Sequence, residues 1–191
     1  MSKFRFEETE IEGLYVVEQK IFHDERGYFM ETYNEEFVPY VKHQDGTPAV
    51  FVQDNESLSV KGVVRGLHAQ IRFPQGKLVR VIQGRIFDVA VDIRKGSKTF
   101  GKWYGVILSS ENKKQLLIPE GFLHGFLALS DTAITSYKCT NLYHPEDECR
   151  IRWDDPDIGV QWPTEGLQVL IGEKDRSNIS FQTFLEKVCG K

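Results

Sequence analysis

Apolar and polar residues alternate in short runs along most of the chain, which is the pattern of β-strands packed against a core. The clearest run is IFDVAVDI, residues 86–93, where phenylalanine, valine and isoleucine alternate with aspartate and alanine. This alternation predicts a strand with one buried face. Further strands are expected at roughly ten-residue spacing, two of them within residues 4–22 and the others at residues 28–33, 51–60, 78–83, 103–109, 115–119, 120–129 and 132–140.

Turn and loop signals separate these runs. Asp24 to Gly27 has turn chemistry, and residues 41–49 have the Asp, Gly and Pro content of a surface loop. The strand at residues 51–60 is expected to break at Asp54 and Asn55. Many short strands at this spacing favour a sandwich or barrel over alternating strands and helices. No internal repeat or linker is found, so residues 1–191 are predicted to form a single domain.

Two short helices are expected among the strands. Asn34 is placed to cap the first, because two glutamates follow it where negative charge favours a helix N-terminus. Residues 181–188 predict a closing helix with Phe184, Leu185 and Val188 on one face. The predicted architecture is therefore all-β with few helices.

Composition narrows the class of protein. A length of 191 residues suits one core, and 40% hydrophobic with 27% charged residues is ordinary for a soluble globular protein. The net charge of −4 argues against nucleic-acid or membrane-surface binding. Cys139, Cys149 and Cys189 form neither a disulfide framework nor a zinc motif. The N-terminus lacks the apolar core of a signal peptide, so we expect a cytoplasmic protein.

Cationic and titratable side chains concentrate in one stretch, VRGLHAQIRFPQGKLVRV, residues 64–81. They are Arg65, His68, Gln70, Arg72 and Lys77. Such side chains can bind an anion and move a proton beside it, since histidine titrates near neutrality and a lysine can hold a developing oxyanion. The alternative is a solvated basic hairpin that serves only solubility.

The same residue types leave two further questions open. Arg65 and His68 are three positions apart, so an unbroken strand would direct them to opposite faces. Either the chain breaks at Gly66, which we expect, or Arg65 serves a different part of the site. Tyr137 shares a strand face with Thr135 and is either a core aromatic or a proton donor inside a barrel. None of the five histidines forms the HxH pair of a metal-binding barrel, so no metal is expected.

Eight segments between about Phe22 and Asp175 occur in the order found in a known family. They are DERGYFMETY, FVQDNESLS, RGLHAQ, QGKLVRV, FDVAVDIRKGSKTFGKW, LSSENKKQLLIPEGFLHGF, YKCTNLYHPEDE and IRWDDPDIGVQWP. By these segments the chain resembles the RmlC-type nucleotide-sugar epimerases, the dTDP-4-dehydrorhamnose 3,5-epimerases of the cupin superfamily. The resemblance implies a double-stranded β-helix, or jelly roll, usually in a homodimer, that uses neither cofactor nor metal.

The resemblance also implies roles for individual residues. The base is His68, paired with Asp175, the acid is Tyr137, and Lys77 lies near the ketone oxygen. The implied nucleotide-binding positions, with Tyr143 stacking on the base, are Arg26, Glu31, Gln53, Asp54, Asn55, Arg65, His124, Tyr143, Glu148 and Lys174. Two departures bear on the substrate: Ala69 stands where an aromatic is common, and Leu117 where tryptophan is frequent.

The implied substrate is a dTDP-linked 4-keto-6-deoxyglucose, inverted at C3 and C5 to give the precursor of L-rhamnose. Inversion beside a ketone needs a base on one face, a group that holds the enolate and a donor on the other face. His68, Lys77 and Tyr137 have the residue types for these roles. The alternatives are a single-carbon epimerase, a 3,4-ketoisomerase, and a jelly-roll domain that binds a nucleotide sugar without turning it over.

Overall fold

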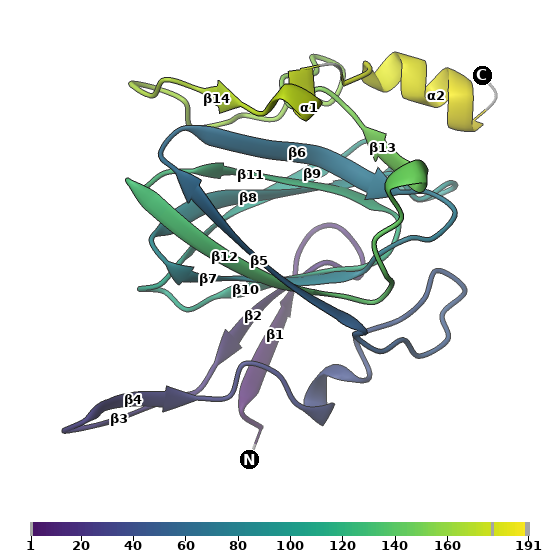
Figure 1. Ribbon diagram of the computed structural model, residues 1–191. Helices are drawn as coiled ribbons and strands as arrows, with labels where there is room; N and C mark the ends of the chain where they lie inside the picture. Colours follow the sequence, from purple (N-terminus) through teal and green to yellow (C-terminus); the bar gives the residue numbers. More distant parts are fainter. Residues whose placement is uncertain (1, 177, 190–191) are drawn as a thin grey trace.

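Two large β-sheets face each other in the computed structural model, which describes residues 2–176 and 178–189 (Figure 1). The first sheet has the spatial order β1 (Phe4–Glu8), β2 (Tyr15–Gln19), β10 (Gln115–Ile118), β7 (Lys77–Gln83), β12 (Thr132–Cys139) and β5 (Gln53–Val60). The second has the order β13 (Glu148–Arg150), β6 (Val63–Gln70), β11 (Phe122–Ala128), β8 (Arg85–Asp92) and β9 (Trp103–Ser109), with β14 (Leu170–Ile171) parallel to β6. Most neighbouring strands are distant in sequence, as in a jelly roll. The predicted fold class is confirmed.

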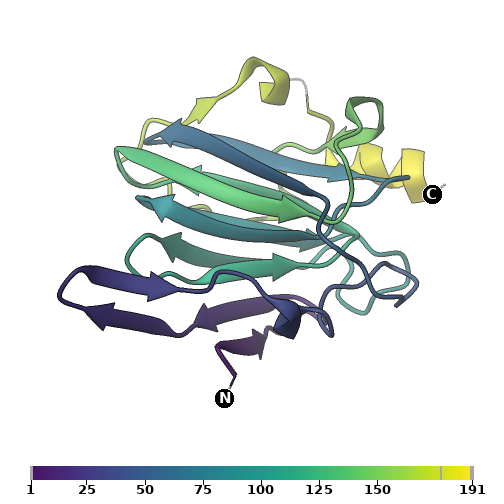
Figure 2. The same cartoon turned by 60° about the horizontal axis from the view of Figure 1, so that its bottom comes forward.

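Short elements lie outside the two sheets. They are the hairpin β3 (Ile21–Asp24) and β4 (Gly27–Met30), the 3₁₀-helices η1 (Glu35–Phe37) and η2 (Pro145–Asp147), and the helices α1 (Glu173–Arg176) and α2 (Phe181–Cys189). The hairpin extends past the ends of the neighbouring strands, on the side of the molecule that carries β1 and β2 (Figure 2). No helix of the described residues combines the length and the apolar character needed to cross a membrane.

Both predicted helices are present. Asn34 caps η1, because its side-chain oxygen accepts a hydrogen bond of 2.9 Å from the backbone N–H of Glu36. In α2, Phe184 is fully buried and Leu185 packs at the edge of the same cluster, as the pattern predicted. The side chain of Val188 lies outside the described residues.

Three apolar clusters hold the layers together. The central one lies between the sheets and joins residues such as Val79 of β7 to Ile86 of β8. A second covers the outer face of β8 and β11 with Phe181 and Phe184 of α2. The third surrounds Phe37 of η1. The second sheet is therefore buried on both faces.

The prediction of one buried face for residues 86–93 is wrong. Asp88, Ala90 and Asp92 are as fully buried as Val89 and Val91 on the other face. The first group faces the interior between the sheets, and the second faces the layer that contains α2. The two aspartates are accepted there because each has polar partners: Asp88 bonds His124, and Asp92 accepts hydrogen bonds from Arg94, Ser97 and Thr99.

The predicted break at Asp54 and Asn55 is also wrong. β5 pairs residue by residue with β12 from Gln53 to Val60 without a register shift. Asp54 lies opposite Lys138, and the ammonium is 3.0 Å from its carboxylate. This cross-strand ion pair accommodates an aspartate inside a regular strand. The unbroken strand places Asp54 and Asn55 on opposite faces.

The predicted break at Gly66 is confirmed. Gly66 has a φ of +128°, and the register between β6 and β11 shifts between His124 and Phe126. A Cβ at position 66 would lie 2.4 Å from the Cα of Gly125, so only glycine fits this close approach. The irregularity turns Arg65 and His68 toward the same cavity, which both of them line.

Candidate active site

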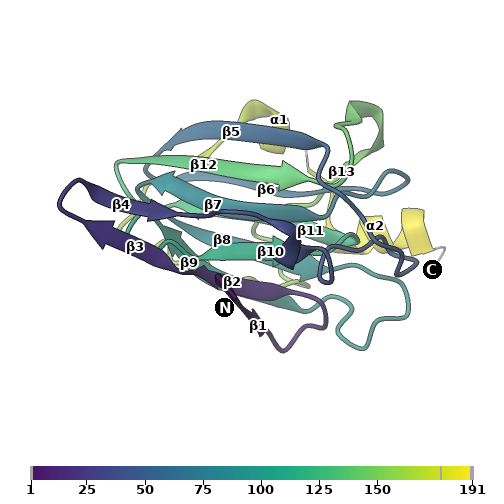
Figure 3. The ribbon, with the colours of Figure 1, turned by 90° about the horizontal axis from the view of Figure 1, so that it is seen from below.

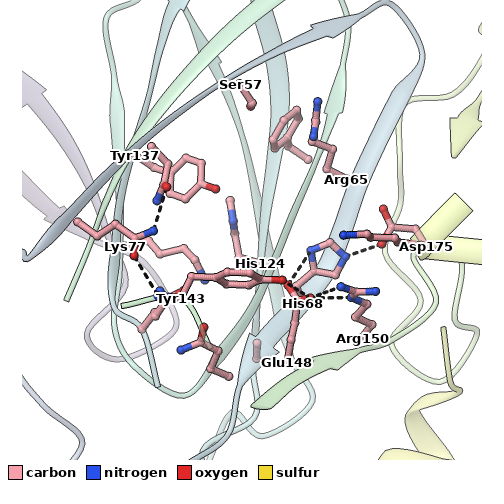
Figure 4. Close-up of a pocket in the computed structure, with 17 residues that line it drawn as sticks. Ser57, Arg65, His68, Lys77, His124, Tyr137, Tyr143, Glu148, Arg150 and Asp175 are labelled. Atoms are coloured by element: carbon pink, nitrogen blue, oxygen red, sulfur yellow. Dashed lines mark hydrogen bonds and ion pairs between the residues drawn. The ribbon is translucent and has the colours of Figure 1, made fainter. Parts of the chain in front are cut away.

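A cavity of about 390 Å³ opens between the sheets, close to the C-terminal segment (Figure 4). Its walls come from β5, β6, β7, β11, β12, β13 and α1. The predicted site residues that line it are Gln53, Asn55, Arg65, His68, Lys77, His124, Tyr137, Tyr143, Glu148, Lys174 and Asp175. These residues span more than half of the chain, and the jelly-roll topology brings them together.

His68 and Asp175 form the shortest polar contact to an imidazole in the cavity. Nε2 of His68 lies 2.6 Å from Oδ1 of Asp175, which the short helix α1 presents to the end of β6. Burial opposes ionisation of Asp175, but the hydrogen bond and the charge of His68 outweigh it and keep the pKa of the carboxyl below its ordinary value. An ionised Asp175 orients the ring and stabilises the imidazolium form. Nδ1 of His68 is left facing Glu148, 4.0 Å away.

Lys77 begins β7 and extends into the same cavity. Only 9% of its surface is exposed. Burial lowers the pKa of its ammonium, although the nearby Cys139, Glu148 and Asp88 act in the opposite direction. The lysine is therefore a poorly solvated cation that an oxyanion would stabilise strongly.

Tyr137 stands on the wall opposite His68 (Figure 4). It comes from β12 in the first sheet, whereas His68 comes from β6 in the second. Burial and the neighbouring Cys139 raise the pKa of the phenol above its ordinary value, against the opposing charge of Arg65. The phenol is thus protonated at neutral pH and can donate. Tyr137 also packs against the central apolar cluster, so it is a core aromatic that lines the cavity as well.

His124 lies directly across from His68 in the β6–β11 pairing. Its Nε2 is 2.8 Å from Oδ1 of the fully buried Asp88. Since this partner fixes the ring, His124 presents a second oriented imidazole to the cavity wall.

Polar and aromatic residues form the mouth of the cavity. The backbone N–H of Tyr143 donates to the side-chain oxygen of Gln53 at 2.9 Å, and its hydroxyl donates to Glu148 at 3.2 Å. Arg65 donates to Ser59 and to the carbonyl of Leu58, which holds its guanidinium against β5. The ring of Tyr143 and the guanidinium of Arg65 thus lie toward opposite ends of β5, and these side-chain types suit a base and a phosphate.

Three predicted binding residues do not line this cavity. Asp54 is on the opposite face of β5, paired with Lys138. Arg26 is at the turn of the β3–β4 hairpin and forms an ion pair with Asp24, while Glu31 follows β4 and pairs with Lys3. The hairpin protrudes at one edge of the molecule, beside β2 (Figure 3), and none of its residues lines the cavity.

Arg150 lines the cavity and was not predicted from the sequence. It comes from β13, where it shares a strand face with Glu148 and lies opposite His68 in register. The alternation of Glu148, Cys149 and Arg150 was a signal for this, because strand geometry puts the first and third on one face. The run was too short to be recognised as a strand.

The two family departures lie in different places. Ala69 borders the cavity, but its side chain is buried with Leu67 in the cluster on the outer face of the second sheet, because strand alternation directs it away from His68. Leu117 is buried in the cluster around Phe37 and does not reach the cavity. Both side chains therefore pack in apolar clusters outside the cavity.

No metal-binding group of three or more His, Cys, Asp or Glu side chains is present in residues 2–176 and 178–189. Cys139 and Cys149 are free thiols, and the side chain of Cys189 lies outside the described residues. Burial raises the pKa of Cys149 to about 11, so its thiol is not a nucleophile at neutral pH.

Known proteins resemble this chain over nearly its whole length. The family model for dTDP-4-dehydrorhamnose 3,5-epimerase matches residues 8–183. The epimerase of that name from Methanothermobacter thermautotrophicus is 58% identical over 178 residues, which cover 93% of this chain and 94% of the relative. The Legionella pneumophila epimerase RmlC, solved in complex with dTDP-4-keto-L-rhamnose, has a TM-score of 0.87 and 49% identity, covering 94% of this chain and 93% of that structure. ChmJ from Streptomyces bikiniensis, a 3'-monoepimerase solved with dTDP-quinovose, has a TM-score of 0.84 and 31% identity. The match covers 95% of this chain and 89% of that structure.

Proposed function

The chain belongs to the dTDP-4-dehydrorhamnose 3,5-epimerase family, and from this premise we propose that it inverts C3 and C5 of dTDP-4-dehydro-6-deoxy-D-glucose. The product is dTDP-4-dehydro-L-rhamnose, so the enzyme is an isomerase. The observation that carries this proposal is the placement of His68 and Tyr137 on opposing walls of one cavity, with Lys77 buried in it (Figure 4).

The proposed reaction begins at His68. Its imidazole removes the proton from the carbon next to the C4 ketone, and the C–H electron pair moves into an enolate whose charge rests on the C4 oxygen. Asp175 stabilises the imidazolium that forms, because its ionised carboxylate lies 2.6 Å from Nε2. A base without this partner would hold its new proton less well at the moment of transfer.

The second half of the reaction uses Lys77 and Tyr137. The ammonium of Lys77 is proposed to bind the enolate oxygen, where burial strengthens the attraction. The phenol of Tyr137 then donates a proton to the carbon from the opposite face, which inverts the centre. The phenolate regains a proton from solvent, and the imidazolium releases one, so each inversion leaves the enzyme unchanged.

The remaining cavity residues are proposed to bind the nucleotide. Arg65 and Lys174 supply positive charge for the diphosphate, and Tyr143 offers its ring to the base. Gln53, Asn55, His124 and Glu148 supply hydrogen-bonding groups for the sugars and the base. No cofactor is required, because proton transfer alone accounts for the change.

Deuterium incorporation tests this proposal directly. The purified protein is incubated with the keto-sugar nucleotide in deuterated water, and the product is examined by NMR. The expected result is deuterium at both C3 and C5 with inversion at each. A product whose ketone has moved from C4 to C3 would identify a 3,4-ketoisomerase. Binding of the nucleotide sugar without any exchange would identify a jelly-roll domain that binds it without turning it over.

A single-carbon epimerase is the second candidate. It is supported by the likeness to ChmJ, a 3'-monoepimerase with the same fold. Deuterium at C3 alone would establish this alternative. The proposed acid and base would keep their roles in either case.

We also propose that the protein acts as a homodimer. The β3–β4 hairpin exposes three aromatic side chains, Phe22, Tyr28 and Phe29, the last of them 65% exposed. An exposed aromatic patch of this kind is typical of a protein interface. Arg26, in the turn of the hairpin, does not line the cavity of its own chain. We propose that a two-fold arrangement brings it to the cavity of a second copy. As a water-soluble sugar-nucleotide enzyme it would act in the cytoplasm.

A further inference from the structure

We propose that Arg150 is a positioning residue that prevents Glu148 from acting as a second counter-ion of His68. The inference rests on the proposed function, in which His68 is the base. It concerns the protonation of that base at working pH rather than contact with the substrate.

The three side chains form one arrangement on two adjacent strands. Arg150 of β13 lies directly opposite His68 of β6, and Glu148 lies opposite the next inward residue, Gln70. The carboxylate of Glu148 therefore sits between the guanidinium and the imidazole. Its Oε2 accepts hydrogen bonds from two nitrogens of Arg150, one of them Nε at 2.7 Å, and its Oε1 lies 4.0 Å from Nδ1 of His68.

The pair is shielded from water. The side chain of Glu148 is 12% exposed and that of Arg150 is 27% exposed, so solvent screens neither charge well. The hydroxyl of Tyr143 adds a third donor to Oε2. Glu148 is consequently neutralised on the side away from His68 and held in one orientation.

His68 faces several other charged or titratable groups in the cavity. They are Asp175 and Lys174 from α1, His124 from β11, Lys77 from β7, Tyr137 from β12, Tyr143 from the loop before η2, and Arg65 from its own strand. Asp175, in direct contact, already favours the imidazolium form. A second unopposed carboxylate at 4.0 Å would favour it further. A base that is protonated before it meets the substrate cannot remove a proton.

Arg150 thus limits His68 to one effective counter-ion. Asp175 assists the imidazolium that forms during the reaction, while the guanidinium offsets the charge of Glu148 that would hold a proton on the resting enzyme. The arrangement allows Glu148 to remain in the cavity as a hydrogen-bonding group without impairing the base.

The test compares pH profiles of complete proteins. Arg150→Met is expected to move the acidic limb of the kcat/KM profile for deuterium incorporation upward by about one pH unit. Arg150→Lys should keep the limb near its original position, because it restores the charge. The double variant Glu148→Gln with Arg150→Met should return the limb to the wild-type value, since the carboxylate is then gone. Arg152→Met is the matched control, because Arg152 pairs with Asp154 on the surface two positions away.

An NMR titration of the His68 imidazole gives a readout that does not need activity. Its midpoint is expected to rise in Arg150→Met and to return in the double variant. Arg150→Gln carries the same expectation if the methionine variant does not fold. An unmoved midpoint, or a rise that persists in the double variant, overturns the proposal. Lack of exchange by the wild-type protein would instead overturn the proposed function, and the titration would still decide the role of Arg150.

Discussion

Nε2 of His68 lies 2.6 Å from Oδ1 of Asp175, although 107 positions separate the two residues in the chain. His68 lies near the end of β6 in the second sheet, and Asp175 comes from the four-residue helix α1, which follows a long irregular segment and the short strand β14. The contact exists because β14 pairs with β6 and fixes the start of that helix over the cavity. The proposed proton transfer therefore depends on the C-terminal segment as much as on the two sheets.

Asp175→Asn is expected to reduce kcat about 100-fold, because the amide orients His68 without stabilising its imidazolium. KM should change little, since Asp175 is not proposed to hold the nucleotide. Steady-state kinetics measure both quantities. Asp131→Asn is the control, because the side chain of Asp131 is 99% exposed. An unchanged kcat would remove Asp175 from the proposed mechanism.

The alternation of apolar and polar residues, with the turn signals between the runs, was sufficient to predict most strands of the two sheets. Alternation predicted the strand of Tyr137 and the strand that begins at Lys77 to within one residue, and the three-residue spacing from Arg65 to His68 indicated a break at Gly66. The strand that carries His68, β6, was not among the expected strands. These features are local, so a strand's own residues reveal them. The burial of the other face of β8, which carries Asp88 and Asp92, was not predictable in this way, because aspartates in an alternating run indicate a solvent-facing side. The buried Asp88 has its polar partner, His124, on a distant strand that only the fold brings next to it.

Residue types alone marked Arg65, His68, Lys77 and Tyr137 as candidates, and the rest of the site was predictable only through the family resemblance. Nothing local to Asp175 or Lys174 marks them as neighbours of His68, since they lie on a single helical turn with no buried residue of its own. Asp54 illustrates the reverse case: its motif suggested a cavity residue, but strand alternation directs it to Lys138 on the other face. Arg150 was missed because a strand of three residues gives almost no periodic signal.

Tyr137→Phe separates exchange from inversion. His68 can still remove the proton, so deuterium should continue to enter the substrate, but without the phenol the carbon is reprotonated mainly from the side of the base. Formation of inverted product is expected to fall about 100-fold while exchange without inversion persists. NMR distinguishes the two products. Tyr104→Phe, in a half-buried tyrosine outside the cavity, should leave both rates unchanged. Equal loss of exchange and inversion would contradict the assignment of Tyr137 as the opposing acid.

Lys77 is expected to set the alkaline limit of the reaction. The ammonium is present below its pKa, and burial lowers that pKa from the ordinary 10.5, so activity should decline at a pH where an exposed lysine is still charged. Lys77→Met should reduce kcat by about 100- to 1,000-fold near neutral pH, the usual loss when one donor to an oxyanion is removed. The pH dependence of kcat measures both effects, with Lys61→Met as the surface control. An alkaline limb that persists unchanged in Lys77→Met would assign it to another group.

The β3–β4 hairpin should carry much of the proposed dimer interface. Phe29 is 65% exposed on a two-stranded ribbon that no other strand pairs with in the described residues. Phe29→Asp places a charge on this surface and is expected to convert the dimer into monomers, as measured by analytical ultracentrifugation. Val50→Asp, at another highly exposed apolar residue, provides the comparison. A wild-type protein that sediments as a monomer at micromolar concentration would contradict the dimer itself.

Mixing two inactive variants tests whether Arg26 serves the cavity of a second copy. Arg26 is 85% exposed in its side chain and lies on the hairpin, while His68 lies inside the barrel, so a shared site would draw them from different chains. Arg26→Ala and His68→Ala should each be impaired alone. In a mixed dimer, one cavity has an intact His68 and receives the intact Arg26 of the other chain. Random assortment makes about half of all dimers mixed, and each mixed dimer has one native site out of two. About a quarter of wild-type activity should therefore return after the subunits exchange. Activity that stays at the sum of the separate variants would place Arg26 outside the site, and the hairpin would then hold the dimer together without supplying a binding residue.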